Sequence, residues 1–264
     1  MASTYAFGNE QEVQRERLRT LEALFDPWTI DRLQARGVGP GWRCLEVGAG
    51  GGSVAVWLSD RVAPNGSVLA TDIDTTVLAA LTHPNLEVRI HDILEHDLPD
   101  GTFDLVHLRL VLAWLPDARA AIERLIAALK PGGWLVVEEL DFVSSVPDRT
   151  MGAAASACFE RIAAAHNAIL AQRNGFDPFY GRRVASDLAE AGLAESGCEG
   201  RVSVWRGGEA GGRIWALTVA QLRGPMIEAG LIDAADVEAA LELFADTRMA
   251  AMSPIMMGAW GRRP

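Results

Sequence analysis

Features that mark several protein classes are scarce or missing in this sequence. Basic residues are outnumbered, because 24 lysines and arginines face 35 aspartates and glutamates, which gives a net charge of −11 over 264 residues. Such acidity disfavours binding to nucleic acid or to an anionic membrane surface. No stretch reaches the ~18 apolar residues of a membrane span, and residues 1–14 lack the basic and apolar segments of a signal peptide. We therefore expect a cytoplasmic protein with neither kind of partner.

Residues that hold metals or form disulfides are also few. The three cysteines, Cys44, Cys158 and Cys198, show no paired spacing, and we expect Cys44 to be a reduced core residue. The five histidines are scattered, so we expect no metal site. Repeats and low-complexity segments are missing, and the glycine-rich segment 207–212 is the one flexible-looking joint. Hydrophobic residues make up 49% of the chain, which is enough for a full core.

What the sequence does contain is a glycine-rich turn after an apolar stretch. Cys44–Ser53 reads Cys-Leu-Glu-Val-Gly-Ala-Gly-Gly-Gly-Ser, in which the apolar part predicts the end of a buried strand. Glycine at 50 and 52 predicts a close approach of a ligand to the backbone. Ser53 is expected to be the N-cap of a following helix. Strand, glycine turn and helix N-terminus together are typical of a nucleotide-binding crevice.

Two nucleotide-binding patterns compete at this turn. The dinucleotide pattern Gly-x-Gly-x-x-Gly fails at its third glycine, where Ser53 stands. The pattern acid-x-Gly-x-Gly-x-Gly is complete in Glu46, Gly48, Gly50 and Gly52. An acid just before the turn suits a cationic or amine-bearing ligand better than a pyrophosphate. At this point the sequence resembles the class I S-adenosylmethionine-dependent methyltransferases, whose first motif has this form.

Strands and helices alternate through the first half of the chain, which predicts a doubly wound, mostly parallel Rossmann-like α/β sheet. We expect strands at 43–47, 67–71, 86–90, 103–108 and 134–140, and helices at 53–61, 75–81 and 118–129, the last ended by Lys130-Pro131-Gly132-Gly133. Later elements are expected as helices at 153–172, 184–191, 214–228 and 236–246 and as strands at 198–205 and 252–261. The resemblance implies seven strands, with the last one antiparallel between the fifth and sixth.

Further matches to the family follow in the expected order. Asp72 ends the second strand about 20 residues after the glycines, where a carboxylate can accept both ribose hydroxyls. Ile73 would offer an apolar face to adenine, and Asp92 with Ile93 would contact its amino group and other face. Asp74 is expected to cap a helix, and Asp104 to bond backbone near the glycine turn. The resemblance assigns to the cofactor Glu46, Gly48, Ala49, Gly50, Gly52, Asp72, Ile73, Asp92, Ile93, Leu108 and Arg109.

The matches cover residues 43–140 and are most similar to the small-molecule branch of ubiquinone, menaquinone and natural-product tailoring methyltransferases, which implies secondary metabolism. The expected organisation begins with an N-terminal helical cap at 1–40, in which Pro27 interrupts the first helix and a second helix follows at 29–36. After the cap we expect a cofactor-binding half (41–143), a helical lid (144–180), a core segment (181–206), a second helical lid (207–251) and the last core strand (252–264). The lids are expected over the carboxyl ends of the strands.

The lids and cap supply the candidates for binding a methyl acceptor. Many of them are methionine or aromatic, which predicts a bulky apolar or aromatic small molecule, although such stripes are often packing alone. The substrate-binding candidates are Tyr5, Trp28, His166, Tyr180, Trp215, Arg223 and Met256. Oligomeric state is left open, with a homodimer as one option.

The activity that this family implies is in-line transfer of the sulfonium methyl to an oxygen, nitrogen or carbon atom, leaving S-adenosylhomocysteine. Such displacement depends on positioning and on exclusion of water more than on covalent help. A general base is needed only for a weakly acidic or protonated acceptor, and the main candidates are His166 and Asp141. Arg109 and Glu139 also lie near the strand ends, and Glu139 or Asp141 could orient an acceptor, whereas His107 is expected to point into the sheet. The alternatives are an S-adenosylmethionine-binding cyclisation catalyst or regulator without methyl transfer, and an NAD oxidoreductase, which Glu46 and Ser53 disfavour.

Overall fold

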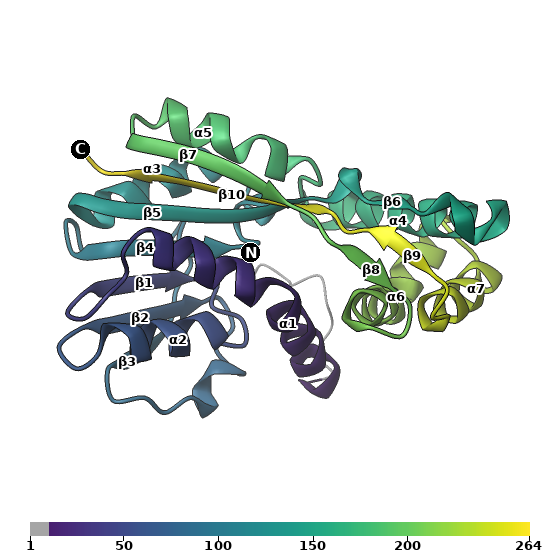
Figure 1. The fold of residues 1–264 in the computed structure, drawn as a ribbon, viewed down its shortest axis with the longest axis horizontal. Coiled ribbons are helices and arrows are strands. Elements are labelled where there is room, and N and C mark those ends of the chain that lie inside the picture. The colour runs from purple at the N-terminus through teal and green to yellow at the C-terminus, as the bar shows by residue number, and fades with distance from the viewer. Residues whose placement is uncertain (1–10) are drawn as a thin grey trace. The chain divides into compact units, whose positions relative to one another are not determined.

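The computed structural model describes residues 11–264 and divides them into two compact units (Figure 1). The sheet unit comprises residues 25–140, 180–201 and 256–264. The helical unit comprises the described residues up to 24 together with residues 141–179 and 202–255. Each is described in turn.

The sheet unit contains a seven-stranded sheet in the order β3-β2-β1-β4-β5-β10-β7. Its strands are β1 Arg43–Val47, β2 Ser67–Asp72, β3 Leu86–Ile90, β4 Phe103–Arg109, β5 Leu129–Asp141, β7 Ala194–Arg201 and β10 Ile255–Arg262. The first five pair in parallel, whereas β10 runs antiparallel to β7. The expected mostly parallel seven-stranded sheet is confirmed, and its last strand lies between the fifth and sixth as expected.

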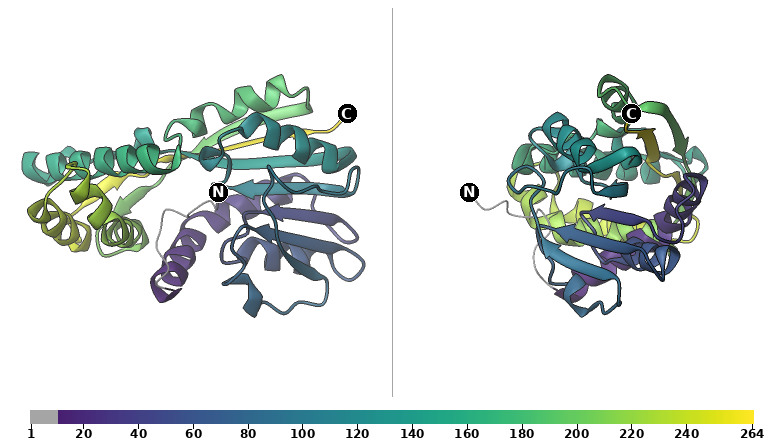
Figure 2. Two further views of the ribbon diagram at one scale, coloured as in Figure 1. Left: turned by 180° about the vertical axis from the view of Figure 1, so that it is seen from behind. Right: turned by 90° about the vertical axis from the view of Figure 1, so that its left-hand side faces the viewer.

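Helices cover both faces of this sheet, as Figure 2 shows for α1 and α3 on opposite sides. The helices are α1 Gln11–Ala35, of which the second half belongs here, α2 Ser53–Val62, α3 Ala118–Ala128 and α5 Val184–Glu190. Leu33 of α1 and Leu58 of α2 share one buried cluster with Cys44 of β1, Leu105 of β4 and Val136 of β5. Because helices bury both faces of the sheet, the central strands have apolar side chains on both faces.

Three local predictions in this part were wrong. Pro27 does not interrupt α1, which continues through it from Gln11 to Ala35 although an interior proline removes one helical hydrogen bond and crowds the preceding turn. The separate helix expected at 29–36 is the end of α1. Ser53 is not an N-cap but the first residue of α2, and the cap is Gly52 in a left-handed conformation. The helix expected at 75–81 shrinks to a single 3₁₀ turn, η1 Leu78–Ala80.

Boundaries in the second half were also misjudged where the chain passes between units. The strand expected at 198–205 is two strands, β7 in the large sheet and β8 Val204–Arg206 in a small one. The last strand is likewise divided into β9 Ala250–Met252 and β10. Residues 130–133 extend β5 rather than forming a helix stop, because α3 already ends at Ala128.

The helical unit is built from the first half of α1, α4 Ala153–Asn174, α6 Ala210–Glu228 and α7 Ala234–Ala245. It also contains an unexpected three-stranded sheet, β6-β9-β8, in which β6 is Val146–Pro147. Its core includes stacked Trp215 and Phe244, 5.8 Å apart, and Phe159, 5.6 Å from Trp215. These helices therefore have their own hydrophobic core, and their function as lids stays a prediction.

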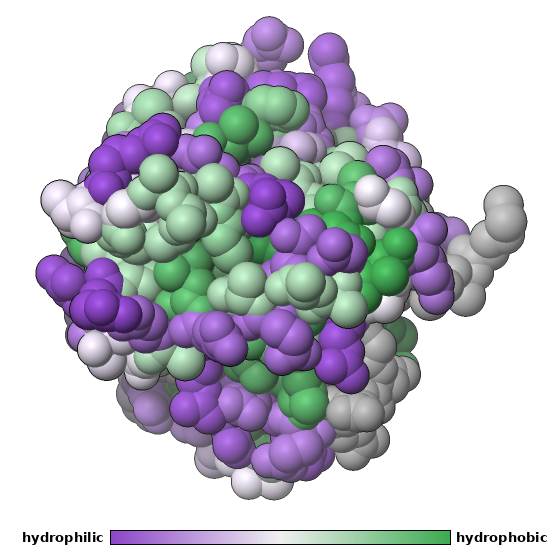
Figure 3. Space-filling view, turned by 90° about the vertical axis from the view of Figure 1, so that its right-hand side faces the viewer, coloured by the Kyte–Doolittle hydropathy of each residue, from purple (hydrophilic) through white to green (hydrophobic). Residues whose placement is uncertain are grey.

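The segment 207–212 is a packed turn and helix start, contrary to the expectation of a flexible joint. Gly211 and Gly212 already lie in α6, where a Cβ on Gly211 would overlap Trp205 and one on Gly212 would come 2.6 Å from the carbonyl oxygen of Phe244. Figure 3, seen from the side where Figure 1 draws α4, α6 and α7, shows hydrophobic patches broken up by hydrophilic residues. Among the described helices, none is both long and apolar enough to cross a membrane.

Candidate cofactor site

The candidate site lies at the carboxyl edge of the sheet unit. Because β1, β2, β3, β4 and β5 are parallel, the segments that follow them meet at the same edge. These segments are the glycine turn Gly48–Gly52, Asp72 with Ile73, Asp92 with Ile93, residues 110–113 and the end of β5. The motifs recognised in the sequence therefore converge on one edge of one unit.

The glycine turn has two packing glycines and one that faces a carboxylate. Gly48, Gly50 and Gly52 all have positive φ, at 67°, 57° and 89°. A Cβ on Gly48 would overlap Val111, and one on Gly52 would overlap Leu81. The expectation that Gly52 is glycine for ligand approach was therefore wrong, since packing and backbone conformation already require it.

Asp72 is fixed at the end of β2 by backbone donors. Its Oδ2 accepts a hydrogen bond from the Gly50 N–H at 2.9 Å, and its Oδ1 accepts one from the Asp74 N–H at 3.1 Å. Burial raises the pKa of this carboxyl, although these hydrogen bonds oppose the shift. Ile73 beside it is 45% exposed. A rigid acceptor next to an exposed apolar side chain suits a ribose joined to a base.

The other predicted base contacts are less open. The Oδ1 of Asp92 accepts a hydrogen bond from the Leu94 N–H at 2.9 Å, which caps the turn after β3. Ile93 is only 4% exposed, so most of its surface packs inside. Asp74 accepts from the backbone and hydroxyl of Thr76, at 2.9 and 2.6 Å, and thus caps a turn rather than a helix.

Glu46 is buried and already paired. Its Oε2 lies 2.6 Å from Nδ1 of His107, the residue opposite it on β4, and it is 3% exposed. The other ring nitrogen of His107 lies 3.6 Å from Glu138 on β5. Burial alone would lower the pKa of His107, but the two carboxylates outweigh it and raise the pKa to about 9. The imidazolium therefore neutralises the motif acid inside the sheet.

This buried pair continues to α1. Burial would raise the pKa of Glu138, but His107 and Arg32 of α1 outweigh it and lower the pKa to about 2. Glu138 also accepts a hydrogen bond from Thr29, and Arg32 pairs with it directly. Neither Arg32 nor Glu138 was predicted to belong to the site, although a glutamate within the apolar stretch Leu135–Leu140 indicates a need for a buried partner.

Two further residues assigned to the cofactor are committed elsewhere. Leu108 is fully buried. Arg109 donates to Thr29 at 2.8 Å and to Asp26 at 2.9 Å, so its guanidinium is held by α1.

Asp104 is structural as expected but lies at the other edge, where it accepts from the Arg43 N–H at 2.8 Å and pairs with Lys130 at 2.7 Å. Ala49 stays in the turn, where its N–H donates to the Thr71 carbonyl at 3.0 Å.

The candidate base His166 lies in the core of the helical unit. It is 5% exposed, and its Nδ1 lies 2.9 Å from the side-chain oxygen of Asn167. Its ring is 5.5 Å from those of Phe142 and Trp215. Burial lowers its pKa to about 4, so the ring is neutral and weakly basic at neutral pH. Asp141, the other candidate, is 6% exposed at the end of β5.

The remaining acceptor-binding candidates do not form one cluster. Tyr180 is buried in the sheet unit, and its phenol donates to Asp187 at 2.9 Å. Met256 is fully buried in β10, and Trp28 packs on Phe25 with ring centroids 5.9 Å apart. Trp215 is buried and Arg223 exposed, both on α6 of the helical unit. Tyr5 lies outside the described residues.

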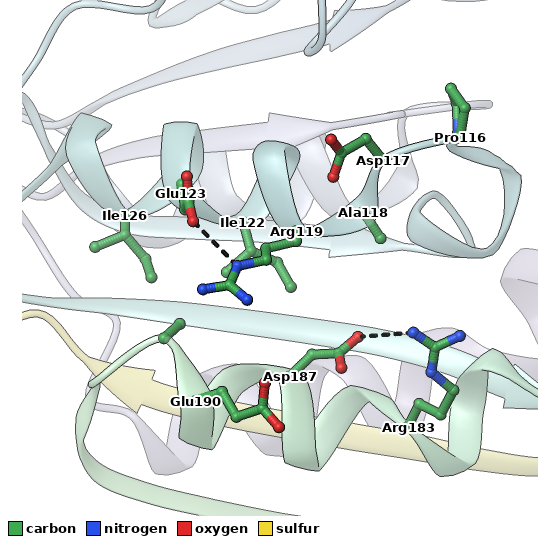
Figure 4. Close-up of a pocket in the computed structure, with 11 residues that line it drawn as sticks. Pro116, Asp117, Ala118, Arg119, Ile122, Glu123, Ile126, Arg183, Asp187 and Glu190 are labelled. Atoms are coloured by element: carbon green, nitrogen blue, oxygen red, sulfur yellow. Dashed lines mark hydrogen bonds and ion pairs between the residues drawn. The ribbon is translucent and has the colours of Figure 1, made fainter.

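A cleft of about 560 Å³ also lies in the sheet unit. It runs between α3 and α5, and Figure 4 shows Arg119 and Glu123 of α3 facing Asp187 and Glu190 of α5. Ion pairs join Arg119 to Glu123 at 3.3 Å and Arg183 to Asp187 at 3.9 Å. None of its lining residues belongs to the glycine turn or to the ends of β1 and β2. Within residues 11–264 no His, Cys, Asp and Glu group could hold a metal ion.

The known proteins that resemble this chain include methyltransferases. A family model described as a methyltransferase domain matches residues 45–137. Methyltransferase str2 of Strobilurus tenacellus is 30% identical over 135 residues, which are 51% of this chain and 48% of that protein. The ubiquinone/menaquinone biosynthesis C-methyltransferase UbiE of Laribacter hongkongensis is 32% identical over 122 residues, which are 44% and 50% of the two chains. The chain thus spans about half the length of these relatives.

Residues 45–137 thus match the methyltransferase domain family, and over this stretch the chain is similar to S-adenosylmethionine-dependent methyltransferases. The fold agrees over a longer stretch. The crystal structure of a Bacillus halodurans protein assigned to the methyltransferases has a TM-score of 0.56, with 17% identity over 88% of this chain and 96% of that one. The sheet unit is called the methyltransferase domain below.

The residues of the methyltransferase domain fit the family's cofactor, S-adenosylmethionine. Asp72 would supply a fixed carboxylate for ribose hydroxyls, and exposed Ile73 would supply an apolar surface for adenine. Gly50 supplies a turn without a side chain at the point nearest that carboxylate. Glu46 fits less directly, because its carboxylate is paired with His107.

Proposed function

We propose that the protein transfers the methyl group of S-adenosylmethionine to an oxygen, nitrogen or carbon atom of a small apolar or aromatic molecule. The observation that supports this most is the position of Asp72, whose carboxylate accepts a hydrogen bond from the backbone N–H of Gly50. Both residues lie at the carboxyl edge of the methyltransferase domain. S-adenosylhomocysteine is then the second product. A place in secondary metabolism is part of this proposal and rests on the resemblance to natural-product tailoring enzymes.

The residues of this chain would act by binding and orientation. The cofactor supplies an electrophilic sulfonium methyl group, and displacement at that carbon needs alignment and exclusion of water. Asp72 would hold the ribose, Ile73 would lie against the base, and the glycine turn would lie along the nucleoside. The buried pair of Glu46 and His107 would keep the strand before the turn in place.

An apolar acceptor is part of this proposal and rests on the sequence, because the aromatic side chains of the helical unit pack mainly on one another. His166 lies between the rings of Phe142 and Trp215, and Phe159 and Phe244 extend the group. The pKa of His166, lowered to about 4 by burial, makes this residue a weak base at pH 7. An acceptor that ionises readily, or one with a nucleophilic carbon, therefore suits this chain better than an alcohol.

Formation of S-adenosylhomocysteine tests the proposal. Purified protein is incubated with S-adenosylmethionine and with phenols, carboxylic acids, quinols and amines in separate reactions, and the product is measured by mass spectrometry. We expect turnover with at least one apolar or aromatic class. Tight cofactor binding without turnover on any class would favour the alternative, a cyclisation catalyst or regulator, for which the weak basicity of His166 is the supporting observation. Binding of NAD(H) in its place would contradict both.

A further inference from the structure

Glu139 is a buried acid that the proposed function does not use. It lies at the end of β5, fully buried, next to Glu138 in sequence but on the opposite face of the strand. Its Oε1 accepts hydrogen bonds from the N–H groups of Val111 at 2.9 Å and Leu112 at 2.6 Å. Its Oε2 is buried without a partner among the described residues. The carboxyl therefore satisfies backbone donors from the segment after β4.

That segment is strained and touches the glycine turn. Leu110 has a φ of 59°, which is uncommon for a residue with a branched side chain, and its N–H donates to the Glu138 carbonyl at 2.8 Å. The next side chain, Val111, occupies the space that a Cβ on Gly48 would need. Glu139 thus holds the backbone that places Val111 on the first glycine of the turn.

We propose that Glu139 is a positioning residue of the cofactor site, which acts through Val111 and Leu112 to fix the conformation of the glycine turn. The claim rests on the proposed function, since the turn matters only if it binds the cofactor. A purely structural acid elsewhere in the domain would affect folding but not this turn. Asp104 is such an acid, because it also accepts from a backbone N–H but at the opposite edge of the sheet.

Conservative and non-conservative variants of Glu139 distinguish a positioning role in the cofactor site from a purely structural role. Glu139→Gln keeps an acceptor for Val111 and Leu112, so S-adenosylhomocysteine affinity measured by calorimetry should stay within about threefold of wild type. Glu139→Leu removes two hydrogen bonds of roughly 0.5–1.5 kcal/mol each, so affinity should fall about 5- to 150-fold. Asp104→Asn, the matched control, should bind as wild type does. Rescue by glutamine with loss by leucine is the expected result.

Amide hydrogen exchange in the unliganded protein tests the mechanism separately. The amides of Val111 and Leu112 should exchange slowly in wild type and in Glu139→Gln, and faster in Glu139→Leu. If Glu139→Leu fails to fold, Val111→Ala replaces it, and we expect weaker S-adenosylhomocysteine binding with slow exchange retained at Leu112. Wild-type affinity in folded Glu139→Leu or in Val111→Ala would overturn the inference. A wild-type protein that does not bind S-adenosylhomocysteine would instead overturn the proposed function, while the exchange result would still report on Glu139.

Discussion

At the scale of single residues, neighbouring buried acids on β5 behave in opposite ways. Glu138 contacts Arg32 and lies near His107, and these cations hold its pKa at about 2 despite burial. Glu139, on the other face, has only backbone N–H donors, and burial raises its pKa to about 8. The strand alternation that separates them therefore decides which acid is ionised at neutral pH.

This difference predicts how stability depends on pH. The pKa of Glu139 is about 8 in the folded chain and near 4.5 in the unfolded one, so the folded state retains a proton that the unfolded state has lost between these values. The contribution of this group is full below pH 4.5 and is lost as pH rises to about 8. Glu138 and Tyr180 are the titratable groups that interact with it. Denaturant unfolding should show a smaller loss of stability from pH 5 to pH 8 in Glu139→Gln than in wild type, and equal losses would contradict this assignment.

At the scale of elements, α1 is attached to the sheet by buried charges. Arg32 and Thr29 bind Glu138, and Asp26 binds Arg109, so one face of the helix carries polar groups into the domain. A helix interrupted at Pro27 could not present Asp26, Thr29 and Arg32 on one continuous face. Its second half is thus an integral part of the domain, which differs from the free N-terminal cap that the sequence suggested.

Removing one charge from the buried pair of Arg32 and Glu138 should lower the free energy of unfolding. Arg32→Leu removes the guanidinium that pairs directly with the buried Glu138 and leaves His107 beside it, and breaking a buried pair in this way costs about 3–5 kcal/mol of unfolding free energy. The double variant Arg32→Leu with Glu138→Leu removes both charges and should recover much of that loss. Urea unfolding at pH 7 measures both, with exposed Arg119→Leu as a control for loss of one positive charge. If Arg32→Leu were as stable as wild type, the ion pair of Arg32 and Glu138 would not stabilise the packing of α1 on the sheet.

At the scale of the whole molecule, the sequence predicted the methyltransferase domain better than the helical unit. The bounds of β1 and β3 were predicted to the residue, because short apolar runs between turn residues are local signals. The small sheet was missed because its strands are only two or three residues long and because β9 pairs with strands that lie far away along the chain, at Val146–Pro147 and Val204–Arg206. The position of Asp72 at the end of β2 was predicted from the sequence, whereas the partners of Glu46 and Glu139 lie in segments far away along the chain, which no single stretch reveals.

The two units should respond to different ligands. With S-adenosylhomocysteine alone, hydrogen exchange should slow at the glycine turn, at Asp72 and at residues 92–94, all in the methyltransferase domain. Around His166 and Trp215 it should slow further only when an acceptor or its product is added. Because Trp215 and Phe159 are already buried in a core of their own, the change should be largest at the exposed ends of α4 and α6. Equal slowing of both units by S-adenosylhomocysteine alone would contradict the separate acceptor site.

The most direct test of the account is calorimetric titration of S-adenosylhomocysteine into the full chain and into Asp72→Ala. Wild type should bind one equivalent. The variant loses charge-assisted hydrogen bonds of roughly 1.5–3 kcal/mol, so its affinity should fall about 10- to 150-fold while Asp104→Ala binds normally. Unchanged affinity in a folded Asp72→Ala protein, or no binding by wild type, would contradict the claim that the carboxyl edge of this domain is the cofactor site.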